Sequence, residues 1–84
     1  MAALSDEALA TALGRLAGWQ QTDGGIQRTY EFADFFSSMR FVHRVADLAL
    51  AAAQRPRIRI HDRAVTLTLG ADGDDIELAQ RIDG

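Results

Sequence analysis

Four arginines in the second half of the chain form the main concentration of like charge in the sequence. They are Arg55, Arg57, Arg59 and Arg63. A guanidinium group presents several N–H donors in one plane and can bind a carboxylate through two parallel hydrogen bonds. The cluster therefore predicts a docking surface for acidic groups on a partner. A solvated sheet face, on which the arginines bind nothing, is an equally good interpretation.

Few other residues could do chemistry. His43 and His61 are the only histidines, and we interpret both as surface residues, because His43 has no evident partner acid in sequence and His61 adjoins a turn. The acidic run Asp72–Asp75 lacks the ligand spacing of a calcium loop, so a helix-capping turn explains it better. The chain contains no cysteine, which excludes thiolate metal sites. We expect neither a metal nor a cofactor.

Composition limits the possible classes of protein. The 84 residues fit one domain, residues 1–84, and 48% of them are hydrophobic, as in a folded protein. The net charge of −3 is opposite to the basic footprint of most nucleic-acid-binding proteins. No run approaches the roughly 20 apolar residues of a membrane span, and the first residues lack the basic region of a signal peptide. We expect a bacterial cytoplasmic protein that binds neither nucleic acid nor membrane.

Hydrophobic spacing and turn residues predict seven elements in the order α-β-β-α-β-β-α. The first helix begins at its cap Ser5 and runs to Gly18. The long helix, about residues 34 to 53, begins at Asp34, and Pro56 stops the chain from continuing it. Apolar residues alternate with polar ones in the two hairpins, and a short helix closes the chain. The fold class is α+β: one four-stranded antiparallel sheet with helices packed on one face.

The long central helix is apolar over most of its circumference. Its polar residues form one narrow stripe, whereas one apolar face would be enough to cover a sheet. The additional apolar surface, represented by Phe41, Val45 and Leu48, predicts a subunit interface and a homodimer. In the alternative interpretation the helix is simply sunk in the protein's own core.

The stretch from Tyr30 to Leu69 resembles the pterin-4a-carbinolamine dehydratase family. That family carries the pattern F-x-F-x-D-F, a helix with F-x-x-x-V-A, the motif E-K-x-x-H-H-P and a strand ending V-x-I-x-L. The matching residues are Tyr30, Phe32, Asp34, Phe35, Phe41, Val45, Ala46, Pro56, Val65, Leu67 and Leu69. The resemblance implies the same α-β-β-α-β-β-α fold, with subunits that associate through the long helix and the sheet edges.

The departures from the family pattern concern its catalytic histidines. The resemblance places the paired histidines at Gln54 and Arg55, and the third histidine at or near Asp72. Glutamine does not exchange a proton near pH 7 and arginine stays protonated, so neither replaces an imidazole as an acid or base. The chain is therefore expected not to be an enzyme and to need no cofactor at its three vacated positions.

A non-catalytic branch of this family is similar in lacking these histidines. That branch is encoded with α-carboxysome components and assists Rubisco assembly, so the leading hypothesis is a Rubisco assembly factor (chaperone) associated with the carboxysome. One alternative is a divergent active 4a-hydroxytetrahydrobiopterin dehydratase in which Asp72 and His61 share the proton transfers. Another alternative is that the chain is a dimerisation cofactor for a second protein. That second protein would present a helix to this chain.

Overall fold

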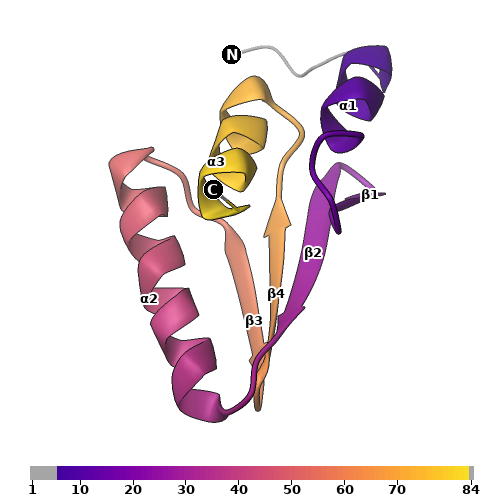
Figure 1. Cartoon of the computed structure of the whole chain (residues 1–84). Helices are drawn as coiled ribbons and strands as arrows, with labels where there is room; N and C mark the ends of the chain where they lie inside the picture. Colours follow the sequence, from indigo (N-terminus) through magenta and orange to yellow (C-terminus); the bar gives the residue numbers. More distant parts are fainter. Residues whose placement is uncertain (1–5, 84) are drawn as a thin grey trace.

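The computed structural model describes residues 6–83 and confirms the predicted α+β architecture. The elements are α1 (Asp6–Leu13), β1 (Gln20–Thr22), β2 (Gly25–Glu31), α2 (Phe35–Ala51), β3 (Arg57–His61), β4 (Ala64–Leu69) and α3 (Gly73–Asp83). All strand pairs are antiparallel, and the order across the sheet is β1-β2-β4-β3. The long helices α2 and α3 lie on the same side of the sheet (Figure 1).

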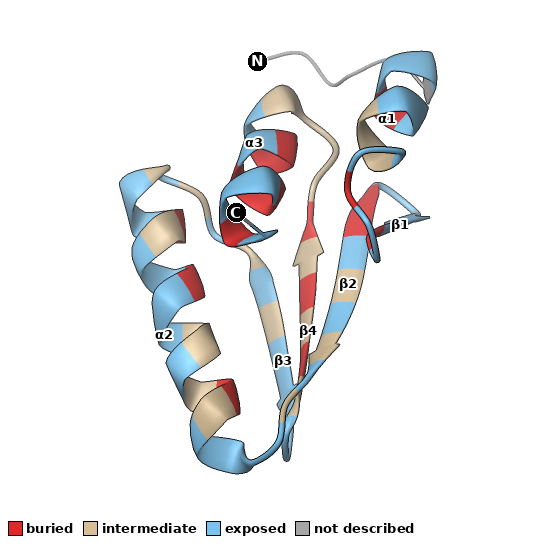
Figure 2. Cartoon of the chain, viewed as in Figure 1, coloured by how far each residue is buried: buried red, intermediate tan, exposed pale blue. Residues whose placement is uncertain are grey.

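The central strand β4 provides the middle of the core. Val65, Leu67 and Leu69 point toward the helices and are buried, whereas the alternate Thr66 and Thr68 point to the helix-free face. Burying each of the three apolar side chains stabilises the fold by about 1.5–3 kcal/mol. The helices place their buried residues against this strand, so that α2 and α3 are buried on their inner sides and exposed outside (Figure 2).

The first helix ends earlier than predicted, and its beginning lies partly outside the described residues. The proposed cap Ser5 is among the residues not described. The helix stops at Leu13 rather than near Gly18, because the chain turns tightly through N–H···O bonds from Arg15 to Ala12 and from Leu16 to Leu13, both 3.0 Å. This turn carries Leu16 into the core.

The long helix begins as predicted at its cap. The Asp34 carboxylate accepts a hydrogen bond of 2.7 Å from the Ser37 N–H, and this bond holds the pKa of that carboxyl below its usual range. The predicted apolar interface on this helix is wrong for Val45, which is fully buried in the protein's own core. Phe41 and Leu48 are half-buried and also pack against the core. The alternative interpretation, a helix sunk in its own core, describes these three residues.

The Asp83 carboxylate connects the last turn of α3 to the rest of the domain. It accepts hydrogen bonds from Trp19 Nε1 at 2.9 Å, from Arg28 at 3.1 Å and from the Tyr30 hydroxyl at 2.6 Å. The Arg28 guanidinium also lies 4.3 Å from the centre of the Tyr30 ring. These contacts tie the β1–β2 hairpin to the C-terminal helix.

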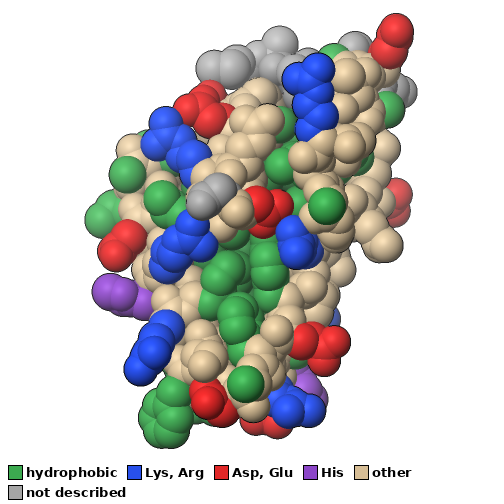
Figure 3. Space-filling view, viewed as in Figure 1, with side chains coloured by type: hydrophobic (Ala, Val, Ile, Leu, Met, Phe, Trp, Pro, Cys, Tyr) green, Lys and Arg blue, Asp and Glu red, His purple; other side chains and the backbone are tan. Residues whose placement is uncertain are grey.

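Aromatic rings extend this connection between β2 and α2. The centroid of the Tyr30 ring lies 4.5 Å from that of Phe41, which in turn is 5.1 Å from that of Phe32. Figure 3 shows a band of hydrophobic side chains between α2 and β2, with basic side chains on either side. None of the helices formed by residues 6–83 has the length and hydrophobicity needed to cross a bilayer.

The environment of Tyr30 predicts an unusual titration. Burial raises the pKa of the Tyr30 hydroxyl, and the adjacent Asp83 carboxylate raises it further, while Arg28 lowers it. Because the folded-state pKa exceeds the unfolded value, the stability from this group is present below about pH 10 and lost above the folded pKa. Tyr30 is the only tyrosine, so tyrosinate absorbance reports on it alone.

We expect the Tyr30 hydroxyl to titrate well above pH 10 in the native protein and near pH 10 in the urea-unfolded protein. The substitution Asp83→Ala should lower the native midpoint. Far-ultraviolet circular dichroism at each pH establishes that the protein remains folded. A native midpoint near pH 10 in folded protein would contradict the described geometry.

Candidate functional site

The three positions that the resemblance assigns to the family's histidines lie at one end of the sheet. Gln54 and Arg55 belong to the loop between α2 and β3, and Asp72 belongs to the loop between β4 and α3. The two loops are neighbours because Arg57, at the start of β3, pairs with Thr68, near the end of β4. The fold thus brings together positions that are 17 residues apart in sequence, from Arg55 to Asp72.

The end of α2 positions Gln54 and Arg55. The Gln54 N–H donates to the Ala49 carbonyl at 2.9 Å, and the Ala53 N–H donates to the Leu50 carbonyl at 3.1 Å. This pair of bonds is a Schellman motif, in which the residue after the cap adopts a left-handed conformation that usually requires glycine. Here that residue is Ala53, with φ of 55°. The motif turns the chain sharply, so that Gln54 and Arg55 follow directly beside the helix end.

Asp72 lies at the start of α3, where its backbone groups take part in the helix cap. Its carbonyl accepts from the Ile76 N–H at 3.1 Å, and its own N–H donates to the Asp75 carboxylate at 3.1 Å. Asp75 thus satisfies a backbone donor that the helix start leaves free, as in a capping box. The prediction that this acidic run caps a helix is confirmed. Among residues 6–83, no group of three histidine, cysteine or acidic side chains is arranged to hold a metal ion.

A groove of about 490 Å³ opens beside Gln54 and Arg55. Its walls are the side of α2 next to β3, the α2–β3 loop and the first part of β3. The lining residues are Ala46, Ala49, Leu50, Ala53, Gln54, Arg55, Pro56 and Ile58. Gln54 and Arg55 are its only side chains that carry polar groups, so the groove holds no group that titrates near neutral pH.

The proposed sharing of protons between His61 and Asp72 does not fit the fold. His61 pairs with Ala64 at one end of the β3–β4 hairpin, whereas Asp72 follows Leu69 at the other end. The five residue-to-residue steps of extended strand from Ala64 to Leu69 span about 17 Å. This mechanism is therefore wrong, because one substrate atom cannot contact both side chains.

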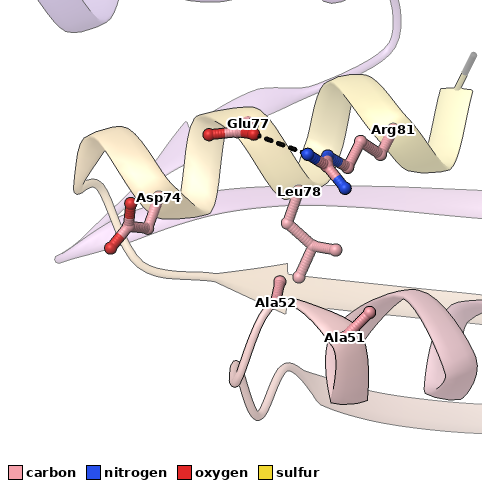
Figure 4. A pocket seen from close by; sticks show the side chains of 6 residues that line it. All are labelled: Ala51, Ala52, Asp74, Glu77, Leu78 and Arg81. Atoms are coloured by element: carbon pink, nitrogen blue, oxygen red, sulfur yellow. Dashed lines mark hydrogen bonds and ion pairs between the residues drawn. The ribbon is translucent and has the colours of Figure 1, made fainter.

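A second, smaller cavity of about 140 Å³ lies between the end of α2 and α3. Figure 4 shows Leu78 pointing from α3 toward Ala52, while Asp74, Glu77 and Arg81 lie along the helix. Glu77 and Arg81 form an ion pair of 2.9 Å in which both side chains are more than half exposed. Exposed pairs of this kind contribute little, so we interpret this cavity as a packing gap between two helices.

The four arginines of the predicted docking surface do not all share one face. Arg57 and Arg59 project from the helix-free face of the sheet, beside Thr66 and Thr68, over a shallow groove of about 370 Å³. Arg55 instead lines the groove beside α2. Arg63 lies in the turn at the far end of the hairpin. Whether any of them binds a partner remains a prediction.

The fold is that of pterin dehydratases. The family model described as "Pterin 4 alpha carbinolamine dehydratase" matches residues 2–84, and the chain belongs to this family. A Koribacter versatilis protein named "Putative pterin-4-alpha-carbinolamine dehydratase" is 45% identical over 85 residues, covering 94% of this chain and 90% of its own. A Mycolicibacterium vanbaalenii protein with the same name is 38% identical over 90 residues, covering 100% and 97%.

A solved structure resembles the present one over nearly its whole length. It is the crystal structure of a transcriptional coactivator/pterin dehydratase from Brucella melitensis, with a TM-score of 0.92 and 28% sequence identity. The match covers 98% of this chain and 96% of the other. It supports both the fold and the membership of the family.

Sequence reasoning did not find the groove beside α2 or the Asp83 network. The groove had a weak signal, since Ala46, Ala49 and Ala53 recur at helical spacing and leave space beside the helix. The Asp83 network had none, because its members lie 53 to 64 residues apart in sequence. His43, for which no partner acid was expected, lies 3.9 Å from Asp47, with both side chains largely exposed.

The left-handed residue at the end of α2 leads to a prediction about stability. Replacing Ala53 by glycine should increase the free energy of unfolding by about 1 kcal/mol, because glycine adopts positive φ without steric cost. The matched control Ala52→Gly, at a residue with φ of −89°, should instead be neutral or destabilising. Urea unfolding followed by the fluorescence of the single tryptophan, Trp19, measures both. A loss of stability in Ala53→Gly would contradict the assigned backbone conformation.

Proposed function

We propose that this chain is a non-catalytic member of the pterin dehydratase family that acts by binding another protein. The observation that supports the proposal is the chemistry of the groove, which is lined by Gln54 and Arg55, the residues that the resemblance assigns to the paired histidine positions. A dehydration needs groups that both give and take a proton, and neither side chain does so near neutral pH. Asp72, at the third position, could act as a base but lacks the paired histidines that would share the proton transfers.

The protein client that we propose is Rubisco, with this chain acting as an assembly factor associated with the α-carboxysome. The support is the resemblance to the family branch that lacks the same histidines and has this role. The free guanidinium groups of Arg57 and Arg59 supply a surface on which acidic groups of a client could dock. We further propose a homodimer through the outer side of α2, where Phe36 and Leu50 are exposed large apolar residues.

A second candidate function is the dehydration of 4a-carbinolamine pterins. The names of the relatives, at 45% and 38% identity, favour it. In this candidate Asp72 would act without His61, since the two residues lie at opposite ends of the hairpin.

A dehydratase assay distinguishes the two candidates. We expect the purified protein to give a carbinolamine turnover equal to that of buffer, with the Koribacter versatilis relative as a reference in the same assay. The triple substitution Gln54→His, Arg55→His and Asp72→His restores the family's residues at the three positions. Activity gained by this variant would show that the side chains, and not the scaffold, account for the inactivity. Turnover by the unmodified chain would overturn the proposal.

Co-expression tests the proposed client. Rubisco subunits are produced in Escherichia coli with this chain or with an unrelated protein of similar size. We expect more assembled enzyme in the presence of the chain, measured by native gel electrophoresis and carboxylation activity. An unchanged amount of assembled Rubisco would exclude this client.

A further inference from the structure

The helix-free face of the sheet is polar across all four strands. Alternate side chains of a strand point to opposite faces, so the strand register decides which residues share this face. They are Gln20, Thr22, Gln27, Thr29, Glu31, Arg57, Arg59, His61, Ala64, Thr66 and Thr68. These side chains stand roughly perpendicular to the sheet, so the face stays open whether or not the backbone edge of β3 is paired with another strand.

The groove of about 370 Å³ on this face, which we call the polar groove, crosses the sheet from β3 to the β1–β2 turn. Arg57 and Arg59 of β3 line one end, and Asp23 of the turn lines the other. The side chains between them carry hydroxyl or amide groups and are Thr22, Gln27, Thr66 and Thr68. The polar groove therefore has a basic end, an acidic end and a neutral polar floor.

The opposite charges at the two ends of the polar groove do not neutralise each other. Among residues 6–83, no ion pair includes Arg57, Arg59 or Asp23, and all three residues are exposed. They belong to the two sides of the sheet, so three strand spacings, about 14 Å in all, separate the backbones of β1 and β3. The groove thus offers guanidinium donors at one end and a carboxylate acceptor at the other.

Hydrogen bonds between strands hold the floor of the polar groove. The hydroxyl groups of Thr29 and Thr66 are hydrogen-bonded at 2.9 Å, and the Thr68 hydroxyl donates to Gln27 Oε1 at 3.5 Å. These bonds leave the amide NH₂ group of Gln27 and hydroxyl lone pairs of the threonines available to a ligand. A ligand on this floor meets hydroxyl and amide groups, which favours a compound rich in hydroxyl groups over an apolar one.

We propose that the polar groove binds a small phosphorylated polyol, such as a sugar phosphate. A phosphate monoester carries a charge of about −1.5 to −2 near pH 7 and three terminal oxygens, so it can accept from Arg57 and Arg59 together. A carboxylate has only two oxygens, which one forked guanidinium occupies. The hydroxyl groups of the ligand bond to the floor, and its far end donates to Asp23. This inference goes beyond the proposed function and does not rest on it.

Ligands with several anionic groups fit the polar groove less well. A dicarboxylate that spans the groove places its second charge beside Asp23, which repels it. A nucleic acid meets the same repulsion and a chain of net charge −3. Acidic groups of the proposed client would use the same two arginines, so a sugar phosphate would compete with that client. The ligand site is therefore tested with the purified chain alone.

A ligand titration followed by nuclear magnetic resonance tests the proposal. The probe is glucose 6-phosphate, added to ¹⁵N-labelled protein at about 0.15 M ionic strength, where attraction between distant charges is screened. We expect saturable shifts of the amide signals of β3, β4 and the β1–β2 turn. Glucose, which lacks the phosphate, should bind at least about tenfold more weakly. Inorganic phosphate and gluconate should each bind at least about threefold more weakly, because each lacks one part of the recognised ligand.

Matched variants locate the site and the orientation of the ligand. Arg57→Gln/Arg59→Gln should weaken glucose 6-phosphate binding at least about tenfold. The control Arg15→Gln/Arg40→Gln removes two exposed arginines outside the groove and should leave the affinity within about twofold. Asp23→Asn, which suits a turn equally well, should weaken glucose 6-phosphate and strengthen inorganic phosphate, because it removes both a hydroxyl acceptor and a repelling charge. The dispersion of the amide signals shows that each variant is folded.

Several results would overturn the inference. They are the absence of saturable shifts, shifts confined to the groove beside Gln54 and Arg55, and an equal loss of affinity in the control variant. If Asp23→Asn strengthened both ligands alike, charge alone would attract them and the polyol would be rejected. Tighter binding of a single-stranded oligonucleotide would assign the groove to a polyanion. Because no Rubisco is present, failure of this ligand site leaves the proposed client in place, and failure of the client leaves the ligand site in place.

Discussion

The packing of β4 against helices on a single side of the sheet is the constraint on which the rest of the structure depends. Three buried side chains of one strand, Val65, Leu67 and Leu69, meet α2 and α3, and no described helix covers the opposite face. Side-chain alternation then requires every second residue of each strand to tolerate water. The threonines of β4 and the arginines of β3 occupy those positions, which is why Arg57 and Arg59 lie together on the helix-free face of the sheet.

The interactions that hold the molecule together are separate from the side chains at the candidate site. The Asp83 carboxylate binds groups of Trp19, Arg28 and Tyr30 and so fixes the C-terminal helix over the sheet. The Schellman turn after α2 fixes one loop at the candidate site through backbone hydrogen bonds, and the Asp75 carboxylate, which accepts from the Asp72 N–H, fixes the other. None of these bonds uses the side chains of Gln54 or Arg55, so the conformation of the two loops does not depend on the residue types at these positions.

Much of the fold could be predicted from local signals. The cap Asp34, the stop at Pro56 and the alternation in both hairpins act over a few residues, and the structure has the corresponding elements. The boundary of α1 was missed because a turn of i to i−3 hydrogen bonds, rather than a helix-stopping residue, ends that helix. The interface on α2 was misjudged for Val45 because periodicity shows that a helix has apolar sides but not how deeply the fold buries each one.

For the candidate site too, some features could be predicted from the sequence and others only from the tertiary structure. The prediction that Gln54, Arg55 and Asp72 stand where the family has histidines comes from residue types and the resemblance alone. Sequence by itself also determined the order of the elements and the row of arginines, because both follow from periodicities of a few residues. Only the tertiary structure decided which arginines share a face, that His61 and Asp72 lie at opposite ends of a hairpin, and that a groove adjoins β3. These facts depend on strand order and helix placement, which are set by packing between residues distant in sequence.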